Sequence, residues 1–145
     1  MPFSFRLKLE IYENGVVTMW REYNPNPRGK SNAGDCVIRA ICKATNQKWG
    51  AVFAELSLIG YYFGDWGNSN AVWDEYLRKK GFNRYILPNT CPYCYTVADF
   101  AKDHPNGTFV LGTGKHAVTV VDGVYFDNWD SGQEMPIYFY TREVL

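Results

Sequence analysis

The spacing of apolar and polar residues divides the chain into predicted elements. Apolar and charged side chains alternate over residues 5–12, which predicts a half-buried strand. The turn signal Asn14-Gly15 follows at once, so residues 16–23 are expected to return as the partner strand of an N-terminal hairpin. Prolines and a glycine over residues 24–30 exclude regular structure there, because they interrupt both helices and sheets.

Helical spacing then dominates the middle of the chain. The predicted helices cover residues 36–44, 49–59, 71–80 and 96–103. Asp35 is the expected N-cap of the first, and Ser69 or Asn70 that of the third. Residues 60–70 are rich in glycine and aromatic side chains, and we expect them to form a loop.

Apolar, β-branched and aromatic runs predict strands around and after the last helix. These strands cover residues 83–87, 108–112, 115–121, 124–129 and 137–143. Helices and strands that occupy separate parts of a chain are typical of an α+β domain. The sequence therefore predicts an α+β fold in which the helices pack on an antiparallel sheet, with an extra N-terminal β-hairpin.

Composition places the chain among globular proteins. Apolar residues make up 46 % and charged residues 21 % of the 145 positions, which excludes an intrinsically disordered chain. The 5 Trp, 11 Tyr and 9 Phe residues can give a domain of this size a large core. We expect a single domain over residues 1–145, with the hairpin in residues 1–24 and the main body in residues 31–145.

Charge and hydropathy restrict the partners and the compartment. Lys and Arg together number 15, as do Asp and Glu, so no basic field indicates nucleic-acid or membrane binding. No run approaches the roughly 20 apolar residues of a membrane span, and the N-terminus lacks a signal-peptide pattern. These features predict a cytoplasmic protein, whose Cys36, Cys42, Cys91 and Cys94 remain thiols.

Cys36 is the first candidate for chemistry, because it lies at the start of a predicted helix. Unpaired N–H groups and the positive end of the helix dipole stabilise a thiolate there, and the thiolate is the nucleophile. The preceding small residues, 31–34, allow a substrate to approach closely. Asp35 acts in the opposite direction, since a neighbouring carboxylate raises a thiol pKa. The alternative interpretation is a cysteine that only packs in the core.

His116 and Asp127 are expected to face each other across a hairpin. A two-residue turn at Asp122-Gly123 would place Asp127 diagonally opposite His116 on the same face of the sheet. That diagonal is about 7 Å between backbones, which a carboxylate–imidazole hydrogen bond can span. A three-residue loop would shift the register by one and bring Asn128 to His116 instead.

These residues resemble a known superfamily. Gly34-Asp35-Cys36 with its helix, and the segment from His116 to Asp127, resemble the papain-like cysteine peptidases. The Cys-to-His spacing is similar to that of compact bacterial members such as bacteriocin-processing peptidase domains. Residues 99–129 also resemble a group of short proteins of bacteria and their viruses. The resemblance covers roughly residues 31–145, which would be the catalytic-type core, and implies a papain-like fold.

The resemblance also implies an activity and roles for the residues. It implies hydrolysis of an amide bond, peptide or isopeptide, in a protein or peptide substrate through a thioester, without cofactor or metal. Deamidation or acyl transfer to an amine would use the same residues, since the outcome depends on whether water or an amine resolves the thioester. Cys36 would be the nucleophile, His116 the base and then the acid, and Asp127 the group that orients His116. The family usually carries a Gln shortly before the cysteine to complete the oxyanion hole. Here Asn32 is the nearest amide that could donate this bond.

Two other functions stay open at this point. Cys91-Pro92-Tyr93-Cys94 matches the CPYC motif of glutaredoxins and predicts thiol–disulfide exchange, although no proline-bearing strand of the thioredoxin-like kind follows it. A single Cys pair with that spacing does not make a zinc site. A papain-like fold could also serve as a non-catalytic binding module. The aromatic run at residues 61–66 would then be an exposed anchor patch.

Overall fold

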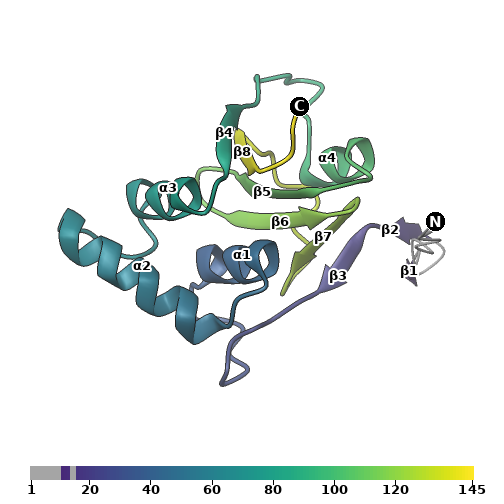
Figure 1. The fold of residues 1–145 in the computed structure, drawn as a ribbon. Coiled ribbons are helices and arrows are strands. Elements are labelled where there is room, and N and C mark those ends of the chain that lie inside the picture. Colours follow the sequence, from purple (N-terminus) through teal and green to yellow (C-terminus); the bar gives the residue numbers. More distant parts are fainter. Residues whose placement is uncertain (1–10, 14–15) are drawn as a thin grey trace, which may run out of the picture.

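The structure is a computed structural model that describes residues 11–13 and 16–145 (Figure 1). Most of the predicted strand over residues 5–12, and the predicted turn at Asn14-Gly15, lie outside the described residues. Within them the chain is α+β, as predicted, with four helices and a six-stranded sheet. None of these helices is long and apolar enough to cross a membrane.

The elements follow the predicted order. The helices are α1 (Cys36–Thr45), α2 (Trp49–Phe63), α3 (Asn70–Lys79) and α4 (Val97–Asp103). The strands are β1 (Ile11–Glu13), β2 (Val16–Thr18), β3 (Trp20–Glu22), β4 (Asn83–Ile86), β5 (Thr108–Gly112), β6 (Ala117–Val121), β7 (Val124–Asp127) and β8 (Tyr138–Thr141).

The main sheet is mixed, and here the prediction of an antiparallel sheet is wrong. Its strand order is β3-β7-β6-β5-β8-β4. β3 runs parallel to β7, with Trp20 opposite Tyr125, while the other neighbours are antiparallel. Parallel neighbours need a long connection, and the four helices and three strands between β3 and β7 provide it.

The N-terminal segment divides between two sheets. β1 and β2 pair antiparallel, with Ile11 opposite Thr18 and Glu13 opposite Val16. Residues 16–23 are not one continuous hairpin strand, because the chain leaves β2 and joins the edge of the main sheet as β3. Figure 1 shows the small β1–β2 sheet at one side of the main body.

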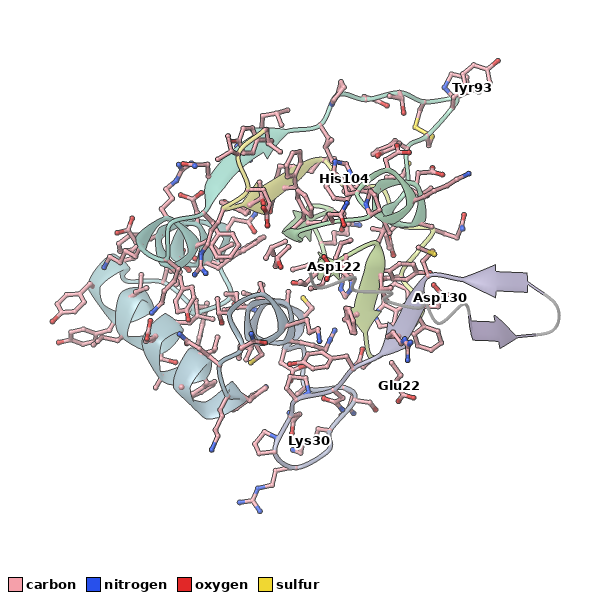
Figure 2. The ribbon with its side chains drawn as sticks, turned by 45° about the vertical axis from the view of Figure 1, so that its right-hand side comes forward. Glu22, Lys30, Tyr93, His104, Asp122 and Asp130 are labelled. Carbon is pink, nitrogen blue, oxygen red and sulfur yellow. A yellow bond between two sulfur atoms is a disulfide. The ribbon has the colours of Figure 1, made fainter. Side chains whose placement is uncertain are left out.

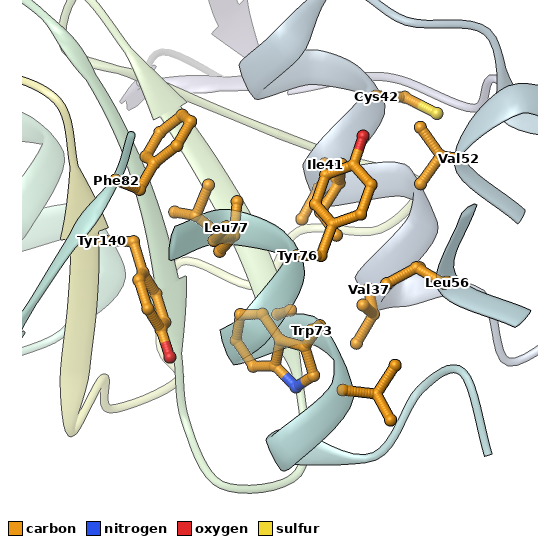
Figure 3. Close-up of a cluster of buried hydrophobic side chains, with 14 of the residues drawn as sticks. Val37, Ile41, Cys42, Val52, Leu56, Trp73, Tyr76, Leu77, Phe82 and Tyr140 are labelled. Carbon is orange, nitrogen blue, oxygen red and sulfur yellow. The ribbon is translucent and has the colours of Figure 1, made fainter. Parts of the chain in front are cut away.

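Two apolar cores hold the helices against opposite faces of the main sheet. The first contains buried side chains of α1, α2 and α3, and Figure 3 shows Ile41 and Trp73 within it. The second lies under α4. Successive residues of β5 alternate between them, because Val110 belongs to the first core while Phe109 and Leu111 belong to the second. Both sheet faces are therefore covered.

Helix boundaries differ from the prediction mainly in α2. The helix continues through Tyr61, Tyr62 and Phe63, which were expected to lie in a loop, and it ends where Gly64 adopts a φ of +66°. The other boundaries agree to within one or two residues. At α4 the Thr96 hydroxyl caps the helix in a reciprocal bond pattern with Asp99.

Candidate active site

Cys36 is the first residue of α1 and is half-buried. The loop before it turns at Gly34, whose φ of +66° favours glycine. Asp35 occupies the predicted N-cap position, but its side chain does not cap the helix. Its buried carboxylate instead accepts hydrogen bonds from Trp49 Nε1 at 2.8 Å and Arg39 Nη1 at 2.9 Å. These bonds tie the loop to α1 and α2 and so fix where the cysteine lies.

The β6–β7 hairpin brings Asp127 to His116, as the sequence predicted. The two strands pair with only Asp122 and Gly123 left between them, and both residues have positive φ, 49° and 80°. Asp127 Oδ2 lies 2.5 Å from His116 Nε2. The predicted register is thus confirmed.

Asn128, the alternative partner for His116, lies elsewhere. Its side-chain amide donates a hydrogen bond to the carbonyl of Ser31 at 3.0 Å, in the loop that precedes Cys36. The backbone of His116 is fixed separately, because its N–H donates a hydrogen bond to Thr113 Oγ1 at 3.1 Å. Asn128 therefore joins the two loops of the site instead of contacting the imidazole.

Asp127 is completely buried and has three further donors around it. Arg39 donates from Nε to Oδ1 at 3.0 Å, and its Nη2 lies 2.9 Å from the same oxygen. Ser131 Oγ donates to Oδ2 at 2.6 Å, and the backbone N–H of Asn128 donates to Oδ1 at 2.8 Å. A buried carboxylate is costly unless it is paired and hydrogen-bonded. Here both conditions hold, so Asp127 remains ionised.

The Cys36 thiol is more acidic than an ordinary cysteine. Burial by itself raises its pKa, but a hydrogen bond with His116, one with the backbone of Ala117, and the positive charges of His116 and Arg39 together lower it below the usual value. Cys42 has the opposite character, because burial and the charge of Asp35 raise its pKa to about 11. The two free thiols of the described residues thus differ in reactivity.

His116 is more basic than an ordinary histidine. Burial lowers its pKa, but hydrogen bonds with Asp127 and Cys36 and their negative charges raise it to about 9. For Asp127 burial raises the pKa, while His116, Ser131 and Arg39 lower it below the usual range. The directions agree with one another. All three shifts favour the charged forms: a thiolate, an imidazolium and a carboxylate.

Cys36 and His116 line one small cavity of about 130 Å³. Two amides, those of Asn68 and Asn70, line it as well. Asn32, the predicted oxyanion donor, is exposed and does not line this cavity. The structure therefore brings Cys36, His116 and Asp127 together, and leaves Asn32 outside the cavity that contains the sulfur.

The Cys91–Cys94 pair forms a disulfide, so the expectation of four thiols is wrong for these two. The pair lies in the loop between β4 and α4, and Cys91 Sγ contacts Met135 Sδ at 3.6 Å. Two cysteines separated by two residues lie close enough to pair whenever the loop curls back, and here Tyr93 N–H bonds to the Thr90 carbonyl. Figure 2 shows Tyr93 at the tip of this loop.

Three residues of the site were not predicted from the sequence: Arg39, Ser131 and Asn68. The sequence does contain a sign of Arg39, because it is a charged residue among the apolar positions of α1. The structure shows that its side chain is buried, which is rare for an arginine without a partner. Trp129 was expected opposite His116 from the same hairpin register. The Trp129 ring lies 5.0 Å from the His116 ring between centroids, at an interplanar angle of 51°. Nothing in the local sequence connects Asn68 or Ser131 to Cys36, because only the tertiary fold brings them there.

The chain matches no protein-family model, no curated protein and no solved structure. Among residues 11–13 and 16–145, no three His, Cys, Asp or Glu side chains gather into a group that could hold a metal ion. What the protein does is therefore argued from the chemistry of the site itself.

Proposed function

We propose that the protein is a cysteine hydrolase that cleaves an amide bond, peptide or isopeptide, through a thioester. One observation carries this proposal: despite burial, the Cys36 pKa is lowered and the His116 pKa raised by the hydrogen bond and charges that they share. A cysteine that only packed in the core would have a raised pKa, as Cys42 has. The arrangement supports a nucleophile with its own proton carrier.

The proposed reaction has two stages. Cys36 Sγ attacks the carbonyl carbon and forms a tetrahedral intermediate, which collapses as the His116 imidazolium protonates the leaving amine. His116 then removes a proton from water, the hydroxide attacks the thioester, and the carboxylic acid leaves as the thiolate and imidazolium re-form. Asp127 occupies His116 Nε2, which leaves Nδ1 for the sulfur.

The oxyanion would be stabilised by the backbone N–H of Cys36 and one side-chain amide. Asn68 and Asn70 are better placed for this role than Asn32, because both line the cavity of the sulfur. The side-chain oxygen of Asn70 accepts a hydrogen bond from Trp73 Nε1 at 3.1 Å. The amino group of Asn70 is then the part of its amide that can donate to the oxyanion. Replacing a single donor of this kind costs about 10²- to 10³-fold in kcat.

We infer a papain-like arrangement from the same elements. The nucleophile starts a helix that packs on β6, and the base and the acid belong to the neighbouring strands β6 and β7 or adjoin them. This order and placement agree with the resemblance of the sequence. A binding module without catalysis remains the alternative; it would retain the fold, but would not require the lowered pKa of Cys36.

The test is hydrolysis of a complex peptide mixture. The protein is incubated with peptides from a digested proteome, and mass spectrometry records new termini and side-chain deamidation. We expect products with the wild type and none with Cys36→Ala, while Cys42→Ala retains activity. Products that persist in Cys36→Ala would contradict Cys36 as the nucleophile, and no products with the wild type would favour the non-catalytic alternative.

A further inference from the structure

Three cavities adjoin one another, and the cysteine lies in the middle one. The first, of about 610 Å³, shares Val37 and Asn68 with the cavity of Cys36. The third, of about 330 Å³, shares Asn70 and Tyr138 with that same cavity. We call the three together the trough. The first and third cavities share no lining residue with each other, so the cavity of Cys36 is the one that links them.

The first cavity is apolar and lies against α2. Trp49 and Phe53 stack with their ring centroids 5.1 Å apart, and Leu56 and Trp66 line the same cavity. Phe53 is 49 % exposed, so part of this apolar surface faces solvent. An exposed apolar concavity of this size can take a large aliphatic or aromatic side chain, whose burial favours binding.

Basic side chains line the trough along its length. Arg28 and Lys30 line the first cavity, and Figure 2 shows Lys30 on the loop between β3 and α1. Lys115 lines the second cavity, beside His116. Arg84 lines the third, where its guanidinium lies 4.4 Å from the centre of the Tyr138 ring.

The carboxylates that line the trough are already engaged. Asp35, in the first cavity, is 6 % exposed and is bonded to Arg39 and Trp49. Asp74, in the third, accepts bonds from Arg78 and from the Tyr140 hydroxyl. No carboxylate of the described residues pairs with Arg84. The trough thus presents excess positive charge although the whole chain has none.

We propose that the substrate of this site is a polypeptide that lies along the trough, with a bulky apolar residue on one side of the scissile amide and an acidic residue on the other. The apolar side chain occupies the first cavity and the acidic one pairs with Arg84 in the third. A small amide would fill only the middle cavity and leave both others without a role. This inference rests on the proposed hydrolase function and narrows its substrate class.

The test uses twelve-residue peptides centred on Gly-Gly. Each carries Phe within three residues on one side and Glu within three on the other, in both orders, with versions in which Ser replaces Phe or Lys replaces Glu. Fluorescence anisotropy measures their binding to the Cys36→Ala protein. In one order we expect the Ser version to bind at least tenfold more weakly. We expect the Lys version to bind about threefold more weakly, with a difference that shrinks as salt is added.

Matched variants assign each preference to its cavity. Phe53→Ser should remove the preference for Phe, while Leu58→Ser on the same helix, outside the trough and 57 % exposed, should not. Arg84→Glu should reverse the preference between Glu and Lys, while Lys102→Glu on α4 should leave it unchanged. Equal binding of all peptides, or equal effects of the control variants, would overturn the proposal.

Cleavage of the same peptides by the unmodified protein separates this inference from the proposed function. Selective binding without cleavage would support the trough as a peptide site and contradict the hydrolase. Cleavage without any preference for Phe or Glu would support the hydrolase and contradict the trough.

Discussion

At the scale of single residues, Cys36, His116 and Asp127 form a chain of contacts in which each group changes the acidity of the next. Asp127 hydrogen-bonds to His116, and His116 and Cys36 shift each other's pKa toward the charged forms. Arg39 and Ser131 hold Asp127 ionised although it is completely buried. The reactivity of the sulfur therefore depends on residues that do not touch it.

The Asp127→Asn variant tests whether the Asp127 carboxylate supports catalysis or only the fold. The substitution keeps the shape but removes the charge, so we expect kcat to fall by about 10²- to 10⁴-fold. The substitution should also destabilise the fold, because Arg39 loses a buried counter-charge. The free energy of unfolding should fall by up to about 3–5 kcal/mol, so the assay must be run where urea titration shows the variant folded.

Asn128→Ala is the control for that variant. Asn128 bonds to the Ser31 carbonyl at an exposed position, and its loss should change kcat by no more than about twofold. If Asp127→Asn were as active as Asn128→Ala, the role assigned to the carboxylate would be wrong.

At the scale of elements, α1 has two functions at its first turn. It presents Cys36 at its N-terminus, and one turn further Arg39 reaches Asp35 and Asp127 together. The guanidinium thus joins the loop before the helix to strand β7. Because its side chain is 5 % exposed, these bonds are protected from solvent.

Arg39→Ala should therefore destabilise the protein strongly. Two buried carboxylates would lose their cation, and we expect the free energy of unfolding to fall by about 3–5 kcal/mol in urea titration. Arg78→Ala removes an exposed pair with Asp74 on α3, and its effect should be far smaller. Equal effects of the two variants would show that the buried pairs do not stabilise the fold as described.

Short-range signals predicted most elements and much of the site. The Asp122-Gly123 turn determines which residue of β7 reaches His116, because side chains alternate along strands. The end of α2 was missed, since Tyr61 and its aromatic neighbours can continue a helix as readily as form a loop. The residues of β3 were predicted as strand, but its pairing with β7 was missed, because β7 lies about a hundred residues later and no local pattern specifies it.

At the scale of the whole molecule, the disulfide loop and the trough are separate features. Neither Cys91 nor Cys94 lines any of the three cavities that make up the trough. The thiol–disulfide alternative also lacks a helix that begins at the motif, because α4 starts at Val97, after the Thr96 cap. No residue between β4 and α4 lines the trough, so the proposed hydrolysis gives this loop no role.

Replacing both cysteines of that loop should leave peptide cleavage within about twofold of the wild type. The disulfide closes a short loop, so Cys91→Ser with Cys94→Ser should lower the free energy of unfolding by at most about 2 kcal/mol. An insulin-reduction assay provides the opposing readout. Activity there that depends on Cys91 and Cys94, with no peptide cleavage that depends on Cys36, would make the redox function the correct one.

The most direct test of the account is the pH dependence of Cys36 alkylation by iodoacetamide, followed by mass spectrometry of each thiol. Because only the thiolate reacts, the rate should rise through a midpoint below the usual thiol pKa of about 8.5. It should exceed the rate of Cys42, and His116→Ala should move the midpoint upward. A midpoint at or above about 8.5 that does not respond to His116→Ala would contradict the Cys36–His116 ion pair and the hydrolase built on it.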